Sequence, residues 1–331
     1  MKKIINNPNT IVEDTLKGFV CANSDIINLV PGTHIVQRKA TKDKGKVRFM
    51  MANGAGHEPA VSCWVGEGMF DMNVVGEVFT CPSSGHIYEG IKRLSANGPV
   101  LVAIQNHAGD VINGGLAIKK AADEGLDVQS VLFYDDIASA PKDAIEERRG
   151  IGGMIFYSKI VGAMAEQGDD MDSLIKVFSQ VRDNTRTIAF AVTNCTNPIT
   201  GLSMFNDLPD DSIELGMGVH GEGGGADRIK IPTAKELAKL LSDKLIEDGE
   251  YKAGDKLLVF VNGSGGMTSM ELSMIYGGIH DYLESQGLQV VGCKVGTYLT
   301  TQELSGASVS FCRVDDQMLA LWNAPCKVSV F

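Results

Sequence analysis

The sequence predicts an α/β protein made of two α/β domains with mixed, largely parallel sheets. Two observations predict this class: short apolar runs rich in β-branched residues, and longer stretches of helical periodicity that alternate with them. Strands joined by helical crossovers produce such an alternation. The expected strands are Lys46–Met51, Pro99–Ile104, Val128–Phe133, Thr187–Val192, Lys256–Val261 and Val290–Val295. The expected helices are Ile87–Leu94, Gly115–Glu124, Ile155–Gly168, Asp172–Val181, Thr233–Ile246 and Ser269–Gln286.

The chain length favours two domains. A chain of 331 residues is longer than one hydrophobic core usually supports. The helical stretch that ends at Val181 is followed by a fresh apolar strand from Thr187, so we place the boundary near Asp183–Arg186. The expected N-terminal α/β domain covers residues 1–185, and the C-terminal α/β domain covers residues 186–331.

The composition is that of an ordinary globular protein. A net charge of −11 without a basic stripe argues against direct contact with nucleic acid or an anionic membrane. Seven cysteines without CxxC spacing argue against a disulfide framework or a zinc cage. The N-terminal stretch lacks an apolar signal segment, and no run reaches the roughly 20 apolar residues that span a bilayer. We therefore expect a cytoplasmic protein that needs no metal or cofactor.

A first glycine-containing loop follows the expected strand Lys46–Met51. It reads Asn-Gly-Ala-Gly-His-Glu-Pro over residues 53–59. Glycines at 54 and 56 let backbone amides approach an oxygen-rich ligand, and His57 stands beside them. A plain strand-to-helix turn with a solvated histidine explains the same residues, because glycine turns are common.

A second loop, residues 105–110, reads Gln-Asn-His-Ala-Gly-Asp and follows the expected strand Pro99–Ile104. A carboxylate at a strand end, here Asp110, can orient an imidazole and raise its basicity. The alternative is an Asx-turn or a helix N-cap, for which aspartate is equally suited. The spacing alone favours this structural alternative.

A third loop, residues 216–225, surrounds His220 with glycine. A neutral imidazole is a nucleophile, and its attack on a ketone would give a hemiaminal. The alternative is a flexible surface loop, but so much glycine is entropically costly, which favours function. A fourth loop, Asn262–Thr268, resembles a phosphate cradle but lacks the P-loop lysine. A turn with a Ser or Thr helix cap is the favoured interpretation there.

Taken together, the loops resemble the dihydroxyacetone kinase K-subunit (DhaK) family. The family carries the motifs GGGSGHEP, KN-Tyr-[ST]-GD, F-T-S-P and G-x-G-x-H-G-E-P-G. Here they read NGAGHEP (53–59), QNHAGD (105–110), FTCP (79–82) and GMGVHGEGGG (216–225). The opening MKKIIN, the stretch 147–150 and the ending around Ala324-Pro325 are also similar. Each motif is weak alone, but the combination is specific and runs from end to end.

The resemblance implies a K-subunit-like fold, a homodimer and binding of dihydroxyacetone. It assigns to His220 the covalent capture of the ketone carbon as a hemiaminal. It makes His57 the general base toward a substrate hydroxyl, with Asp110 beside it. Further ligand contacts are implied for Gly54, Ala55, Gly56 and Gln105.

Departures from the family motifs concentrate in these loops. Ala55 and Cys81 replace serines, Gln105 replaces a lysine, and His107 replaces a tyrosine. Each change removes a hydroxyl or ammonium donor that could position a ligand or a transferring phosphate. The residues that would capture the ketone are retained, whereas residues that would support phosphoryl transfer are replaced. This pattern is typical of a sensor derived from an enzyme.

Two functions follow from this resemblance. The leading hypothesis is a non-catalytic paralogue similar to the DhaQ-type co-activators, which bind dihydroxyacetone and partner a TetR-family regulator of the dihydroxyacetone kinase operon. The alternative is the dihydroxyacetone-binding subunit of a phosphotransferase-dependent dihydroxyacetone (glycerone) kinase, whose partner is an L-subunit. A longer ketose such as erythrulose would fit the alternative as a substrate.

Overall fold

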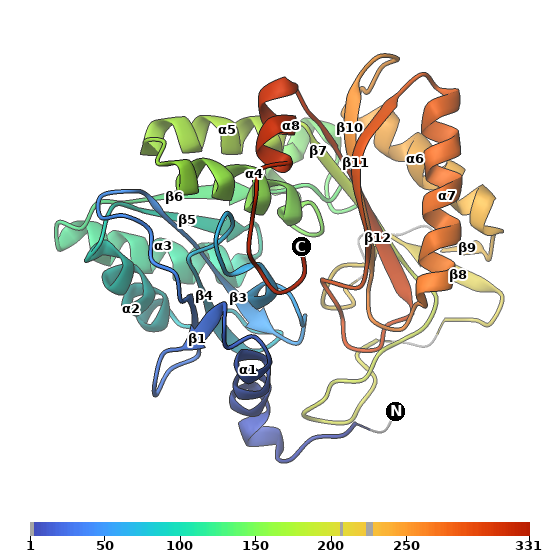
Figure 1. Cartoon of the computed structure of the whole chain (residues 1–331). Helices are drawn as coiled ribbons and strands as arrows, with labels where there is room; N and C mark the ends of the chain where they lie inside the picture. The colour runs from blue at the N-terminus through green and yellow to red at the C-terminus, as the bar shows by residue number, and fades with distance from the viewer. Residues whose placement is uncertain (1–2, 206–207, 223–227) are drawn as a thin grey trace. The chain divides into compact units, whose positions relative to one another are not determined.

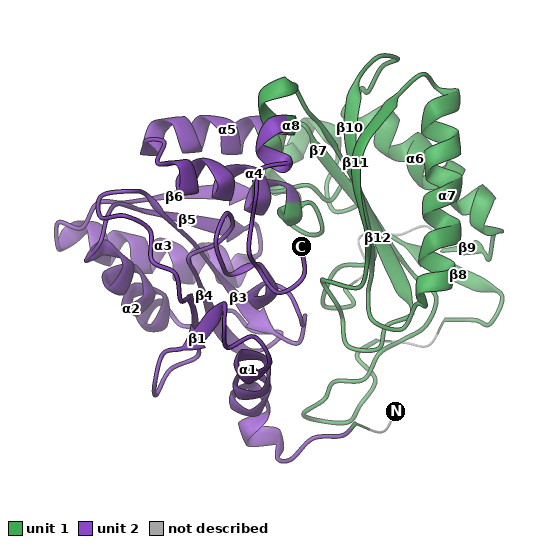
Figure 2. Ribbon diagram, in the orientation of Figure 1, with its two compact units in different colours: residues 1–3, 134–155, 181–319 green, residues 4–133, 156–180, 320–331 purple. Residues whose placement is uncertain are grey.

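The computed structural model describes residues 3–205, 208–222 and 228–331. The chain divides into two compact units, which Figure 2 colours separately. Unit 2 contains residues 4–133, 156–180 and 320–331, and unit 1 contains residues 1–3, 134–155 and 181–319. The chain thus passes from one unit to the other five times. A division into domains at 185/186 stays a prediction; one of the five crossings, at 180/181, lies close to it.

The sheet of unit 2 is mixed, with a parallel majority as the sequence predicts. Its strands follow the order β1-β2-β4-β3-β5-β6. The strands β4, β3, β5 and β6 are parallel neighbours, and β1 and β2 form an antiparallel edge. The bounds are β1 Ile27–Leu29, β2 Ile35–Arg38, β3 Arg48–Ala55, β4 Met72–Val78, β5 Val100–Gln105 and β6 Val128–Phe133.

Helices cover both faces of this sheet, as Figure 1 shows. Along β3, Met50 and Ala52 join the apolar cluster formed with two helices of one face, α2 and α3. On the other face, the ring of Phe49 lies 6.3 Å from the ring of Tyr157 in α4. Alternate side chains of a strand point to opposite faces, so β3 serves both layers. The helix bounds are α1 Ile11–Ala22, α2 Ser84–Ser95, α3 Ala108–Asp123, α4 Met154–Gln167 and α5 Met171–Asp183.

The sheet of unit 1 is also mixed, but here antiparallel pairs dominate, which corrects the prediction of largely parallel strands. The described strands follow the order β11-β10-β12-β7-β8-β9, and only β10 and β11 among them pair in parallel. The bounds are β7 Thr185–Ala191, β8 Ser212–Leu215, β9 Arg228–Lys230, β10 Lys256–Gly263, β11 Gln289–Gly296 and β12 Gly306–Arg313. No described helix separates β11 from β12 or β7 from β8, and parallel pairing needs a long crossover.

Two helices of unit 1, α6 (Ala234–Gly249) and α7 (Ser269–Ser285), pack on one face of its sheet. Both begin with a capping box, in which Thr233 and Thr268 accept from the third helical residue. The loop Asn262–Thr268 is therefore a turn that ends in a threonine cap, as predicted. The last helix, α8, covers Asp316–Trp322.

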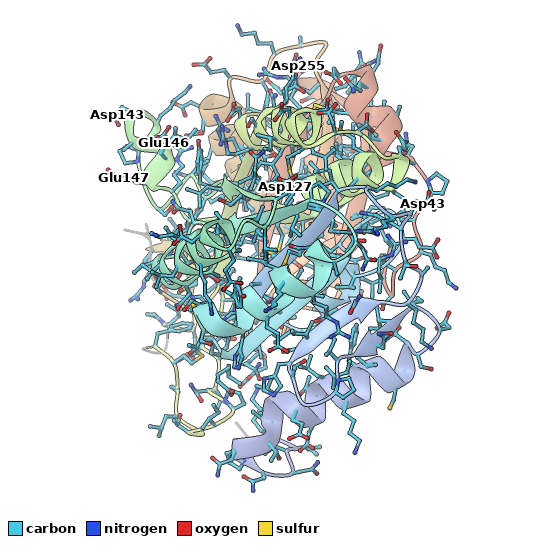
Figure 3. The ribbon with its side chains drawn as sticks, turned by 90° about the vertical axis from the view of Figure 1, so that its left-hand side faces the viewer. Asp43, Asp127, Asp143, Glu146, Glu147 and Asp255 are labelled. Carbon is cyan, nitrogen blue, oxygen red and sulfur yellow. The ribbon has the colours of Figure 1, made fainter. Side chains whose placement is uncertain are left out.

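All six predicted strands and all six predicted helices overlap elements of the structure. Part of the chain's negative charge lies on a short 3-10 segment, Lys142–Glu147, where Asp143, Glu146 and Glu147 are exposed (Figure 3). Among the described residues, no helix combines the length and the apolar character that crossing a membrane requires.

Candidate functional site

In unit 2, three loops with candidate residues lie at one edge of the sheet. They follow β4, β3 and β5, which are adjacent and parallel. The carboxyl ends of parallel strands meet at the same sheet edge, which is where ligands bind in such folds. The loops of residues 53–59, 79–82 and 105–110 are therefore neighbours, although 45 residues lie between the first and the third in the chain.

His57 lies in a closely packed loop after β3. The side chain is only 5% exposed, and its ring is 5.2 Å from the ring of Phe79 in an edge-on arrangement. The preceding residue, Gly56, has a φ of +100°, and a Cβ there would lie 2.9 Å from the ring of Phe79. Glycine is required at this position on both counts. The alternative of a solvated histidine is therefore wrong, because His57 is buried.

One backbone amide of this loop is bound by a side chain of the same loop. The Gly56 amide donates to the Glu58 carboxylate at 3.0 Å, and burial raises the pKa of Glu58. A Cβ on Gly54 would lie 2.8 Å from the backbone nitrogen of Thr80, so the loops after β3 and β4 touch here. Glu58 has no role in the sequence-based predictions, and its place in the motif of residues 53–59 is the only signal that points to it.

Asp110 lies in the first turn of α3, and His107 occupies the N-cap position of that helix without a side-chain cap bond. The alternative interpretation, in which Asp110 is the N-cap residue of this helix, is therefore wrong. Burial raises the pKa of Asp110 to about 7. A carboxyl group with such a pKa exchanges its proton near neutral pH, which suits general acid–base chemistry.

Cys81, in the loop after β4, contacts the start of α3. Its Sγ accepts from Asn113 Nδ2 at 3.2 Å, and a Cβ on Gly109 would lie 3.0 Å from it. Burial, and then the charge of Asp110, raise the pKa of the Cys81 thiol. The thiol stays protonated at neutral pH and is not activated as a nucleophile. Gln105, the last residue of β5, is 4% exposed at the same sheet edge.

In unit 1, His220 lies in a closed turn after β8, which we call the His220 turn (residues 216–222). The Gly218 amide donates to the Glu222 carbonyl at 2.7 Å, and the Gly221 amide donates to the Gly218 carbonyl at 3.0 Å. Gly221 has a φ of +78°, a left-handed conformation that favours glycine. Residues 223–225 of the predicted loop lie outside the described residues.

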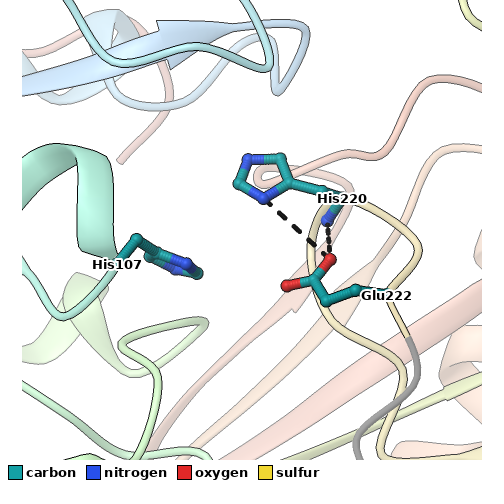
Figure 4. Close-up of side chains that lie close together, drawn as sticks. All are labelled: His107, His220 and Glu222. Atoms are coloured by element: carbon teal, nitrogen blue, oxygen red, sulfur yellow. Dashed lines mark hydrogen bonds and ion pairs between the residues drawn. The ribbon is translucent and has the colours of Figure 1, made fainter.

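The carboxylate of Glu222 faces His220 within this turn, as Figure 4 shows. It accepts the His220 backbone amide at 2.8 Å, and one of its oxygens lies 3.9 Å from the imidazole Nδ1. The His220 side chain is 33% exposed, so the imidazole is accessible to a small molecule. Glu222 belongs to the glycine-rich motif around His220, but its pairing with His220 was not predicted from the sequence.

Residues outside the His220 turn contact it at Val219 and Gly221. Thr301 Oγ1 donates to the Val219 carbonyl at 2.6 Å. A Cβ on Gly221 would lie 2.6 Å from the ring of Phe205, so that ring closely adjoins the turn. A cavity of about 20 Å³ beneath Gly218 and Val219 has room for a water molecule but not for a ketose. A ligand of His220 must therefore approach from the exposed side of the turn.

The two mixed sheets with their helices make this an α/β protein of two units, with histidines in the loops that follow the strands. Comparison with known proteins shows the family to which the chain belongs. Residues 17–330 match the Dak1 domain, and the chain belongs to the Dak1 domain family.

Relatives with known names cover the chain almost completely. It is 37% identical over 317 residues to a dihydroxyacetone-binding subunit DhaK of a PTS-dependent dihydroxyacetone kinase from Listeria innocua, covering 96% of this chain and 95% of that one. It is 33% identical to an L-erythrulose 1-kinase from Mycolicibacterium smegmatis, over 100% of this chain but 58% of that one.

Among solved structures, the dihydroxyacetone kinase operon co-activator DhaQ superposes with a TM-score of 0.89 at 31% identity. The match covers 96% of this chain and 97% of that one. The dihydroxyacetone kinase of C. freundii superposes with a TM-score of 0.87 at 26% identity, over 99% of this chain and 60% of that one. The predicted resemblance and the predicted α/β fold are thus confirmed.

Proposed function

We propose that the chain binds dihydroxyacetone and captures its ketone carbon as a hemiaminal on His220. The observation that carries the proposal is the accessible imidazole of His220, held in a closed glycine turn with the Glu222 carboxylate near Nδ1. Relatives named for dihydroxyacetone binding and extending over nearly the whole chain support the choice of ligand.

The proposed step balances without a further reactant. The imidazole nitrogen that faces away from Glu222, Nε2, forms a bond to the ketone carbon, and the carbonyl π pair moves to oxygen. That oxygen takes up a proton, and the imidazole gives up the proton from Nδ1. The Glu222 carboxylate lies on the Nδ1 side and stabilises the positive charge that develops there.

The residues of unit 2 receive the roles that the family resemblance implies. His57 is the general base toward a substrate hydroxyl, and Asp110 acts beside it. A pKa of about 7 for Asp110 suits a group that exchanges protons at neutral pH. The remaining contacts with ligand are assigned to Gly54, Ala55, Gly56 and Gln105.

In the cell, we propose that the protein acts as a homodimeric, cytoplasmic co-activator of a TetR-family regulator of a dihydroxyacetone kinase operon. The likeness to a co-activator over nearly the full length of both chains supports this role. Four loop positions, Ala55, Cys81, Gln105 and His107, lack the donors of the family motifs. Ligand capture would favour the conformation that the regulator binds, a shift set by differential affinity.

A second candidate function is the substrate-binding subunit of a phosphotransferase-dependent kinase, with an L-subunit as partner. The 37% identity to a kinase subunit over 95% of its length favours it. The likeness to erythrulose kinases adds a four-carbon ketose as a candidate substrate.

One experiment separates the two functions. The purified protein is mixed with the L-subunit and phosphoryl-donor proteins of a related kinase, phosphoenolpyruvate and dihydroxyacetone, and phosphorylated product is measured. The related DhaK subunit serves as the positive control. The co-activator proposal predicts binding of dihydroxyacetone without product. Product formation at the rate of the control would contradict it and favour the kinase.

A further inference from the structure

Arg149 lies beneath the His220 turn and is fixed along its whole length. Its carbonyl accepts the amides of Asp135 and Asp136 at 3.0 and 3.1 Å, and its amide donates to Ser139 Oγ at 2.9 Å. Its guanidinium donates to the Asp136 carboxylate from Nε at 2.9 Å, and Nη2 lies 2.7 Å from the same oxygen. The Asp136 side chain is 1% exposed. The arginine is therefore anchored in the interior of unit 1.

The two terminal nitrogens of the guanidinium contact both ends of the His220 turn. Nη2 donates to the Gly216 carbonyl at 3.1 Å, at the start of the turn. At its end, Nη1 donates to the Glu222 carbonyl at 3.4 Å and lies 3.2 Å from the Glu222 carboxylate. A planar guanidinium is suited to such multiple contacts, whereas an ammonium is a single point charge.

Gly218 leaves the room that this ion pair needs. A Cβ at Gly218 would lie 2.2 Å from the Glu222 carboxyl carbon and 2.4 Å from Arg149 Nη1. Any side chain at this position would displace the carboxylate or the guanidinium. The glycine content of the turn thus serves the Arg149–Glu222 pair as well as access to His220.

We propose that Arg149 is a positioning residue for His220. Anchored on Asp136, it holds the Glu222 carboxylate beside the His220 amide and Nδ1. A carboxylate on that side keeps the neutral imidazole proton on Nδ1, which leaves the Nε2 lone pair to attack a carbonyl. Arg149 itself does not need to touch the ligand. The ligand part of this inference rests on the proposed ketone capture, whereas the control of the tautomer does not.

The test measures the His220 tautomer and ketone binding in the same full-length proteins. The variants are Arg149→Gln, Arg149→Lys and Glu222→Gln. The matched control is Arg228→Gln, because Arg228 also pairs with a glutamate, Glu214 at 3.3 Å, but is half exposed. Nitrogen-15 NMR of labelled histidine reports the tautomer in the free protein. Calorimetric titration with dihydroxyacetone gives the dissociation constant, and thermal unfolding checks the fold.

We expect the wild type and the control to hold His220 mainly as the Nδ1–H tautomer. Arg149→Gln should give a mixture of tautomers and weaken dihydroxyacetone binding about tenfold, which is about 1.4 kcal/mol. Arg149→Lys keeps the charge and should fall between the two. If Arg149→Gln fails to fold, Glu222→Gln must show the same loss of tautomer preference.

If folded Arg149→Gln keeps the tautomer of the wild type, the positioning role is overturned, whatever its affinity for dihydroxyacetone. If Arg149→Gln does not fold, the same result in Glu222→Gln overturns it. A wild type that keeps one tautomer and loses it in Arg149→Gln, yet binds no dihydroxyacetone, would uphold the positioning role. That result would contradict the proposed function instead.

Discussion

The two units prepare their candidate groups by different physical means. In unit 1, His220 is one-third exposed and is held by ion pairs and hydrogen bonds that run from Asp136 through Arg149 to Glu222. In unit 2, His57 is almost fully buried, and burial alone raises the pKa of Asp110 to about 7. A nucleophile must be accessible to its ligand, so charged neighbours rather than burial are suited to orient it. A carboxyl group that exchanges protons near neutral pH needs a raised pKa, which desolvation provides.

Removal of the two histidines should have unequal effects on ligand binding. His220→Ala should weaken dihydroxyacetone binding by at least about 100-fold, about 2.7 kcal/mol, because the covalent bond is lost. His57→Ala should weaken binding by less than about tenfold, since a general base is not required for capture. Calorimetric titration measures both. Equal losses in the two variants would show that the roles are wrongly divided.

Two aspartates with the same raised pKa offer a second contrast, in stability. Burial raises the pKa of Asp135 to about 7, as it does for Asp110. Asp135 accepts the amides of Ile151 and Gly153 at 2.6 and 2.7 Å, and the Thr187 hydroxyl. Asp135→Asn should cost about 2–3 kcal/mol, because an amide NH₂ would face a donor. Asp110→Asn should cost less than about 1 kcal/mol.

Urea unfolding of the two variants, followed by circular dichroism, gives both free energies. A loss for Asp110→Asn as large as that for Asp135→Asn would mean that Asp110 is a structural group. Its raised pKa would then say nothing about catalysis or binding.

Glycine substitutions test whether the Arg149–Glu222 pair needs the space at Gly218. Gly218→Ala should displace the Arg149–Glu222 pair, cost about 1–3 kcal/mol and weaken ketone binding. The control is Gly277→Ala in α7, where no atom lies within 4 Å of the added Cβ, so stability should rise by about 0.5–1 kcal/mol. Thermal unfolding and ligand titration of both proteins check this. Normal binding by Gly218→Ala would mean that the pair is dispensable.

The last contrast concerns the pH dependence of stability. The folded pKa of Asp110, about 7, lies above its ordinary value of 3.8, so the folded state binds this proton more tightly. The resulting stability is complete below about pH 4 and is lost as pH rises through about 7. Relative to Asp110→Asn, the wild type should therefore lose stability between pH 4 and 7. A difference between the two proteins that stays constant over this range would contradict the burial of Asp110.

Local patterns were sufficient to predict much of the fold. The strands β3, β5 and β10 and the helices α6 and α7 have strong periodicity, and the structure has them within a few residues of the prediction. The strand β12, which lies between β10 and β7 and is antiparallel to both, was not predicted. Strand direction depends on long-range pairing, which apolar runs do not encode.

The candidate site was predictable to the level of its loops but not of its contacts. His57 and His220 stand out in the sequence because each lies in a loop with several glycines and the motifs are specific in combination. The Arg149–Glu222 contact joins residues 73 positions apart, and no local pattern connects them. The burial that shifts the pKa of Asp110 is likewise a property of the folded chain.

Covalent capture on His220 can be observed by carbon-13 NMR of dihydroxyacetone labelled at its ketone carbon. The bound ligand should lose its carbonyl resonance and show one typical of a tetrahedral carbon that carries both nitrogen and oxygen. With nitrogen-15-labelled histidine, that carbon should couple to an imidazole nitrogen, and His220→Ala should abolish the signal. A bound ligand that keeps its carbonyl resonance in the wild type would contradict the account.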